Sequence, residues 1–291
     1  TASGGKGSVS VTFEFPAHAD FASVTAKLVS VKNLSETPIE DLLTLETQSD
    51  GTKTVTYSKT DLARGTYILF LMLTNHQGNT TTIPKRLSVA TGMESTADSS
   101  ETTNSDGKIV ISAEQANIRY EKYVSALGND TTGTGTYDKP FATLSTAITA
   151  INDENISDKD WTIWVTGRVE GCTAIASPKA TSLSIEGMTG NTTDILDGKA
   201  GGSVLKISGD TPILLKNIQI TGGTGSGTSG TYGGGLYISG ATVKLSDGVL
   251  ITGNSVTANG GGIYNNGTLV MSGGVVSGNQ TQQQSGGGIF V

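Results

Sequence analysis

The side chains that could support catalysis lie in the middle of the chain and are missing from its last quarter. Arg168 is the last arginine of the 291 residues. Four acidic residues near or after it are candidates for chemistry: Glu170, Glu186, Asp194 and Asp197. Acid–base cleavage of a glycosidic bond needs two titratable groups that face the same bond. Residues 222–291 carry only Lys244 and Asp247 as charged side chains, so a catalytic site there is excluded.

These acidic residues also have a structural interpretation. Asp197 precedes Gly198 in a turn signal, and Glu186 and Asp194 flank predicted turns. Two carboxylates that converge with Arg168 or a lysine on one outer face would favour an enzyme instead. We predict no catalytic, cofactor-binding or metal-binding residue.

Two other sequence features do not predict a cofactor, disulfide or zinc site. Residues 225–230 match the G-x-G-x-x-G pattern, but a strand rather than a helix follows them, so no dinucleotide site is expected. The only cysteine, Cys172, can form neither an internal disulfide nor a zinc site.

The elements that must position these residues repeat along the chain. Glycine triplets open residues 233–238, 260–265 and 286–291, at offsets of 27 and 26 residues. A second phrase recurs at residues 250–254 and 275–279, at an offset of 25 residues. Such a period indicates a stack of one supersecondary unit, here with about three short strands in each coil.

The repeat assigns equivalent places to several side chains. Asn254 and Asn279 are expected to bond to each other along the stack at a turn. Tyr237 and Tyr264 form a ladder, which would suit a polysaccharide if it points outward and would only stabilise the stack if it points inward. Trp161 and Trp164 should lie on opposite faces of one strand, and the outward one could stack on a sugar or pack under a loop.

A short helix is predicted before the stack. Phe141, Leu144, Ile148 and Ile151 recur at helical spacing, and Thr143 is the expected N-cap. The phrase Lys-Pro-Phe-Ala-Thr-Leu at residues 139–144 resembles the start of right-handed parallel β-helix proteins of the pectate-lyase-like superfamily. That resemblance implies a helix that caps the N-terminal end of the stack.

The tail resembles the Gly-Gly-x-Ile…Asn repeats of polymorphic outer-membrane and adhesin-type β-helix proteins. This second resemblance covers roughly residues 200–291. Because the third repeat stops at Val291 without a polar cap, we expect a longer β-helix, or an end-to-end contact that covers the last coil.

The first part of the chain predicts a different fold. Residues 8–92 alternate apolar and polar side chains in short runs, which is typical of half-buried strands. Leu62, Gly65 and Tyr67 match a Leu-x-x-Gly-x-Tyr phrase, and the segment resembles bacterial immunoglobulin-like domains, in which the Tyr hydroxyl bonds back to the preceding corner. His18 and His76 are expected to be solvated loop residues.

We therefore predict an all-β protein with three regions. They are an immunoglobulin-like β-sandwich at 1–92, a Ser/Thr-rich linker at 93–110, and a right-handed single-stranded parallel β-helix with a short capping helix at 111–291. The linker is assigned because its residues are too polar to bury a core.

The composition limits the function. A net charge of −7 argues against nucleic acid or an anionic membrane as the main partner, and no apolar run could span a bilayer. The resemblances imply a bacterial cell-surface or secreted protein, such as a lipoprotein, whose signal or anchor lies outside this sequence. Its expected role is an adhesin or structural stalk that binds a host protein or a polysaccharide without enzymatic activity. The alternative is a polysaccharide lyase or glycoside hydrolase.

Overall fold

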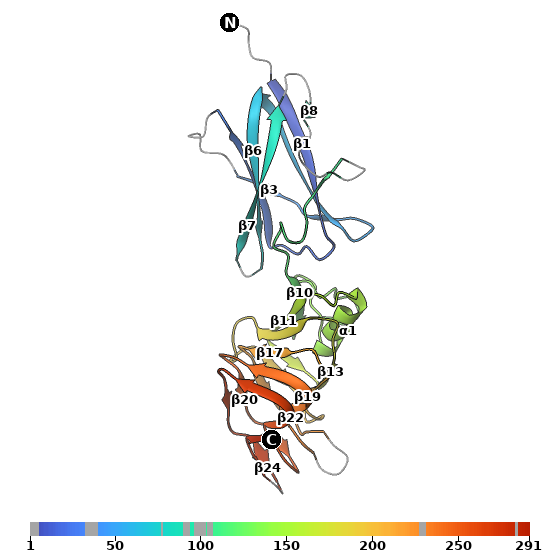
Figure 1. The fold of residues 1–291 in the computed structure, drawn as a ribbon, viewed down its shortest axis with the longest axis vertical. Coiled ribbons are helices and arrows are strands. Elements are labelled where there is room, and N and C mark those ends of the chain that lie inside the picture. The colour runs from blue at the N-terminus through green and yellow to red at the C-terminus, as the bar shows by residue number, and fades with distance from the viewer. Residues whose placement is uncertain are drawn as a thin grey trace. The chain divides into compact units, whose positions relative to one another are not determined.

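The chain forms two compact β-rich units, Thr1–Arg119 and Tyr120–Val291 (Figure 1). The computed structural model describes residues 6–32, 40–76, 78–89, 94–95, 103, 107–226, 231–282 and 285–291. These residues are mostly in strands, with a single α-helix among them, so the predicted all-β class is confirmed.

The contacts place the boundary between the units later than the sequence predicted. Ile109 and Ile111 are fully buried in the core of the first unit. Lys108 also lies 3.4 Å from Glu14 of the same unit. Part of the predicted linker and the first residues of the predicted second domain therefore belong to the first unit. Residues 93, 96–102 and 104–106 of that linker lie outside the described residues.

The first unit consists of two sheets. One has the order β4-β5-β1-β8, with β9 also paired to β1, and the other has the order β3-β2-β6-β7. Pairing is antiparallel except where β8 and β9 join β1. The strands are β1 Lys6–Phe15, β2 Ser23–Ser30, β3 Glu40–Leu43, β4 Glu46–Thr47, β5 Lys53–Ala63, β6 Gly65–Thr74, β7 Thr80–Val89, β8 Glu94–Ser95 and β9 Ile109–Val110.

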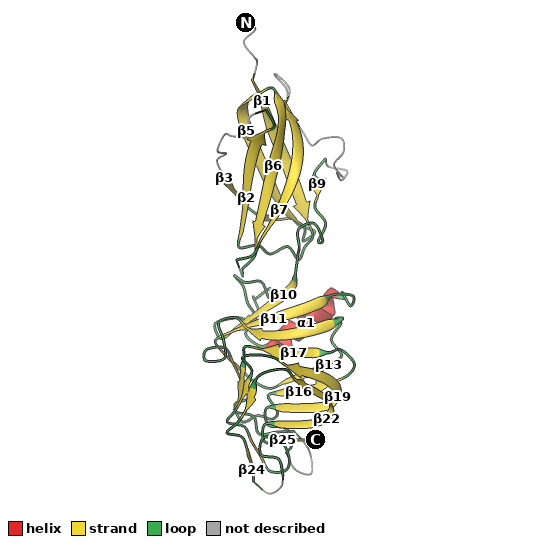
Figure 2. Ribbon diagram, turned by 60° about the vertical axis from the view of Figure 1, so that its left-hand side comes forward, coloured by secondary structure: helices red, strands yellow, loops and turns green. Residues whose placement is uncertain are grey.

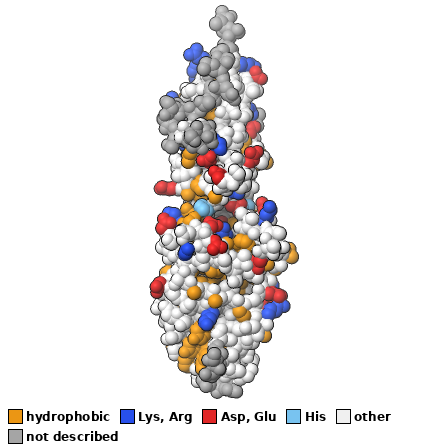
Figure 3. Space-filling model, turned by 90° about the vertical axis from the view of Figure 1, so that its right-hand side faces the viewer, with side chains coloured by type: hydrophobic (Ala, Val, Ile, Leu, Met, Phe, Trp, Pro, Cys, Tyr) orange, Lys and Arg blue, Asp and Glu red, His pale blue; other side chains and the backbone are white. Residues whose placement is uncertain are grey.

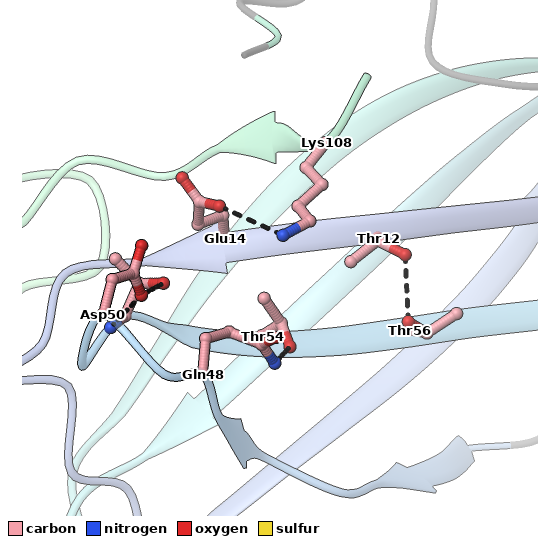
Figure 4. A network of polar contacts seen from close by, with 8 residues as sticks. Thr12, Glu14, Gln48, Asp50, Thr54, Thr56 and Lys108 are labelled. Atoms are coloured by element: carbon pink, nitrogen blue, oxygen red, sulfur yellow. Dashed lines mark hydrogen bonds and ion pairs between the residues drawn. The ribbon is translucent and has the colours of Figure 1, made fainter. Parts of the chain in front are cut away.

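Alternating side chains of both sheets meet in one core. Phe13 and Phe15 of β1 are buried together with Leu69 and Leu71 of β6, because every second side chain of a strand points to the same face. The outward side of β1 and β5 is polar, and Thr12 and Thr56 join their hydroxyls at 2.9 Å (Figure 4).

Two predicted contacts of the first unit have different outcomes. The Tyr67 hydroxyl donates to the Ala63 carbonyl at 2.8 Å, as the resemblance implied. His76 was expected to be solvated, and that prediction is wrong: its side chain is 7% exposed and its Nε2 lies 3.3 Å from Asp20 Oδ1. His18 is half-buried.

The second unit is built from parallel strands (Figure 2). Its helix is α1 Leu144–Glu154, and its strands are β10 Tyr120–Ser125, β11 Asp160–Thr166, β12 Arg168–Glu170, β13 Thr173–Ala176, β14 Ser182–Gly187, β15 Ile195–Asp197, β16 Leu205–Ser208, β17 Ile213–Lys216, β18 Gln219–Thr221, β19 Leu236–Leu245, β20 Leu250–Ile251, β21 Ser255–Val256, β22 Ile263–Met271, β23 Val275–Val276, β24 Gln280–Thr281 and β25 Ile289–Phe290.

Strands of successive coils lie in register above one another. One sheet has the order β12-β15-β18-β20-β23, and a short sheet pairs β21 with β24. The largest sheet joins two stacks at β19: residues 236–239 continue the stack of β13 and β16, whereas residues 243–245 continue the stack of β14 and β17. The inward side chains of these stacks, apart from the β21–β24 pair, form one core.

The predicted helix covers one end of this core. Thr143 is the N-cap and its Oγ1 accepts a hydrogen bond from Thr146 N, whereas Asn155 ends the helix in a left-handed conformation. Leu144, Ile148 and Ile151 of α1 are buried in the same cluster as the strands. Within the described part of the chain, no helix has the length and apolar character needed to span a membrane.

Candidate functional site

Four charged residues meet on the outer face of the sheet that begins with β12 and β15. Glu170 and Asp197 are register partners on these strands. Arg168 Nη1 lies 3.2 Å from Asp197 Oδ2, and Lys199 Nζ lies 2.7 Å from Glu170 Oε1. We call Arg168, Glu170, Asp197 and Lys199 the charged cluster. The cluster brings two carboxylates and two cations together. From the sequence, such an arrangement was expected to favour an enzyme.

The contacts within the charged cluster limit what it can do. Asp197 is 8% exposed, and its Oδ1 also accepts a hydrogen bond from Lys199 N at 2.9 Å. Gly222 of the next coil packs so closely on the same oxygen that a Cβ added there would lie only 2.1 Å from it. The next coil therefore covers this carboxylate. The hydrogen bond and charge of Glu170 raise the pKa of Lys199, which keeps that ammonium protonated and unable to act as a base. The cluster thus links neighbouring coils.

The other two acidic candidates lie elsewhere and are occupied. Asp194 is fully buried and accepts hydrogen bonds from Gly167 N at 3.0 Å and from Gly190 N at 2.9 Å. Its carboxylate therefore holds two turns together. Glu186 of β14 faces Lys216 of β17 at 3.4 Å. Within the described residues, neither Asp194 nor Glu186 forms a side-chain hydrogen bond or ion pair with a member of the charged cluster.

Metal and thiol chemistry have little support in the described residues. No group of three or more His, Cys, Asp or Glu side chains there could hold a metal ion. The Cys172 thiol donates to the Gly198 carbonyl at 3.4 Å, and partial burial raises its pKa, which disfavours the reactive thiolate. Residues 227–230 of the glycine-rich pattern lie outside the described residues.

An aromatic ladder runs along the outer face of β16, β19, β22 and β25. Tyr237 and Tyr264 stack with centroids 5.3 Å apart and planes at 12°, and Tyr264 and Phe290 stack at 5.6 Å and 8°. Lys206 Nζ lies 5.8 Å from the Tyr237 ring centre, at the other end of the row. Tyr232 packs on Tyr264 at 5.2 Å and 59°.

The ladder points outward, since Leu236 and Ile238 on either side of Tyr237 are fully buried. Its rings nevertheless stack on one another, so the faces of Tyr264 are covered and only its edge and hydroxyl group can meet a ligand. Hydrophobic side chains are visible on the surface of the second unit in Figure 3. The ladder is therefore first a stabilising stack, and Tyr264 could meet a sugar only at its edge.

Two residues of this row, Phe290 and Lys206, were not assigned from the sequence. Phe290 follows Tyr264 by 26 residues, the same period as the glycine triplets, so the repeat could have revealed it. Lys206 has no glycine triplet before it, and only the register of β16 with β19 places it below Tyr237.

Asn254 and Asn279 bond to each other along the stack, as predicted, and we call this pair the asparagine ladder. Asn254 is 1% exposed, and its Oδ1 accepts a hydrogen bond from Gly223 N at 2.9 Å. Its Nδ2 donates to Asn279 Oδ1 at 2.9 Å and to the Ile220 carbonyl at 3.1 Å. The amide groups thus satisfy backbone groups of three successive coils, which confirms the predicted structural role.

The two tryptophans lie on opposite faces of β11, as predicted. Trp161 is buried in the core, and its Nε1 donates to the Ile156 carbonyl at 3.3 Å. Trp164 points outward between Tyr123 and Glu186, its register partners on β10 and β14, and is half-buried. The outward tryptophan therefore offers little free ring surface.

Searches against protein-family models, curated proteins and solved structures find no match. The function must therefore be inferred from the geometry of this chain.

Proposed function

We propose that the protein is a non-enzymatic bacterial protein of the cell surface or the extracellular medium. In this proposal the second unit is a right-handed parallel β-helix that serves as a rigid stalk, and the first unit is an immunoglobulin-like binding module. Its partners would be a host protein or a glycan.

The observation that carries this proposal is the occupation of the candidate acidic side chains. Glu170, Glu186 and Asp197 each meet a cation of a neighbouring segment, and Asp194 binds backbone amides. A general acid or base must be free to exchange a proton with substrate. Carboxylates that already join one coil to the next support a structural role.

The extracellular location can be tested with an antibody raised against the chain. Intact cells of the source organism, or their culture medium, are expected to contain the antigen without permeabilisation. Detection only after the cells are opened would contradict the proposal. An antibody against a cytoplasmic protein of the same cells controls for leakage.

The charged cluster favours a second candidate function, that of a polysaccharide lyase or glycosidase. Its two carboxylates sit on adjacent strands beside Arg168. This alternative requires substrate to displace the ion pairs of Glu170 and Asp197. Substitution of Asp197 by Asn would then abolish cleavage, whereas the structural proposal expects no cleavage by either form.

A further inference from the structure

The two sheets of the first unit present opposite chemistry on their outer faces. On β1 and β5 the outward side chains are hydroxylic, and Ser10 and Ser58 join across the strands at 3.1 Å. On β6 the outward residues are Ile68, Phe70 and Met72, which alternate with the buried leucines of the core. The second sheet thus carries an apolar row along β6, flanked by Thr25 and Lys27 of β2 and by Thr82 and Arg86 of β7.

The apolar row of β6 extends to its neighbouring strands. Val29 and Pro84 are the register partners of Ile68 and Phe70 on β2 and β7. A hollow of about 400 Å³ lies there, lined by Val31, Ile68, Pro84, Lys85 and Arg86. Val31 is 44% exposed, and Leu42 of β3, on the same face, is 76% exposed. Apolar side chains that gather on an outer face in this way are typical of interaction sites.

The β7 edge of this sheet does not favour the addition of another strand. Pro84 lacks a backbone N–H, and Lys85 of the same edge strand, β7, points inward and is only 6% exposed. Proline and inward charges on an edge strand both oppose edge-to-edge pairing. A partner at this edge would therefore pack on the face of the sheet.

The charges at the two edges of the face are opposite in sign. Glu40 lies on β3 at one edge, and Arg86 lies on β7 at the other. Arg86 forms no ion pair with a described residue. Glu40 lies 3.9 Å from Lys27, but its side chain is 55% exposed and remains open to another cation.

We propose that this face binds a second copy of the chain in a two-fold symmetric dimer. A two-fold axis parallel to the strands, between the copies, places β3 over β7 and β2 over β6. Val29 of each copy then lies over Ile68 of the other, and Lys27 lies over Phe70. Glu40 lies over Pro84 and within one register pair of Arg86 of the other copy. An axis across the strands would instead place like edges together and oppose Arg86 to Arg86, which is unfavourable. This dimer lies beyond the proposed function and does not depend on it.

The proposal is tested by sedimentation equilibrium of the whole chain over a wide concentration range. The unmodified protein is expected to form a dimer, and Ile68→Asp to remain a monomer where the unmodified protein dimerises. Thr56→Asp is the matched control, because it places the same side chain on the hydroxylic face of the other sheet. A monomeric unmodified protein at all concentrations, or equal dimerisation of both variants, would overturn the proposal.

Exposed charges provide a second test that does not risk the fold. Arg86→Glu and Glu40→Arg are each expected to weaken the dimer by roughly tenfold, the equivalent of about 1.4 kcal/mol. Together they restore the opposite-charge pairing, so the double variant should recover most of the lost affinity. Additive weakening in the double variant would contradict the two-fold arrangement.

Discussion

The two units differ in which segments of the sequence pair on neighbouring strands. In the first unit antiparallel pairing brings unlike segments together, so that Phe13 lies opposite Val55. In the second unit parallel coils place like residues in line, as with Tyr237, Tyr264 and Phe290. Repetition in the second unit is therefore a requirement of stacking and is weak evidence for a binding or catalytic function.

This difference also separates the candidate roles of the two units. In stacked coils, polar side chains form hydrogen bonds with the neighbouring coil, as Asn254 does with Asn279. The first unit has two sheets of different composition, and the outer face of one of them carries a row of apolar side chains, Ile68, Phe70 and Met72 of β6. The polar groups of the second unit thus hold its coils together, whereas the first unit keeps an apolar row on one outer face.

The largest expected effect comes from breaking the asparagine ladder. Asn254→Ala removes partners of Gly223 N and the Ile220 carbonyl inside the stack. A loss of about 3 kcal/mol in the free energy of unfolding is expected, since buried backbone groups are left without partners. Both tryptophans of the chain lie in the second unit, so their fluorescence during denaturant unfolding measures this loss.

The exposed Asn266 provides the control for that measurement. Asn266→Ala should change the free energy of unfolding by less than about 0.5 kcal/mol. Equal effects of the two substitutions would show that the ladder does not hold the coils together.

The aromatic ladder should give the next largest effect. Tyr264→Ala removes ring contacts with Tyr232, Tyr237 and Phe290, whereas Phe290→Ala removes the contact with Tyr264 alone. With about 0.5–1.5 kcal/mol for each aromatic pair, the first variant should lose about 2 kcal/mol more than the second. The same unfolding experiment compares them, and equal losses would contradict the ladder as a stabilising stack.

A smaller effect depends on pH. Burial opposes ionisation of Asp130, but hydrogen bonds from the Thr143 hydroxyl and from the backbone N–H groups of Thr143 and Ala142 outweigh it and lower the pKa. The stabilisation is present above the pKa of the unfolded chain and is lost as pH falls through the folded value. Because Asp130 is exposed, the change should stay below about 1 kcal/mol.

Unfolding curves of the unmodified protein and Asp130→Asn between neutral and acidic pH measure this effect. The variant should lose stability at neutral pH and show a weaker dependence on acid. The exposed Asp138 of the same loop supplies the control variant, Asp138→Asn. An unchanged acid dependence in Asp130→Asn would mean that this carboxylate does not hold the loop to α1.

The smallest effect is expected in the charged cluster. The Arg168 side chain is 46% exposed, so its ion pair with Asp197 is screened by water. Arg168→Gln should cost less than about 1 kcal/mol of unfolding free energy. A loss several times larger, measured by the same fluorescence, would show that the cluster is more than a surface link between coils.

Local patterns explain which features the sequence could predict. The glycine period, the alternation of the strands and the Thr143 cap are each contained within a few neighbouring residues or a fixed offset. The burial of Ile109 beside β1 could not be predicted, because it depends on pairing with Phe13 far along the chain. The pairing of Arg168 with Asp197 likewise depends on the register between two coils, which no local pattern specifies.

The central claim is that the acidic residues of the second unit hold coils together and do not cleave a substrate. The most direct measurement incubates the whole chain with a panel of acidic polysaccharides, with and without Ca²⁺, and follows the release of unsaturated products and new reducing ends. We predict no release above a heat-unfolded sample. Release that disappears in Asp197→Asn, with the fold intact by fluorescence, would contradict the claim and assign catalysis to the charged cluster.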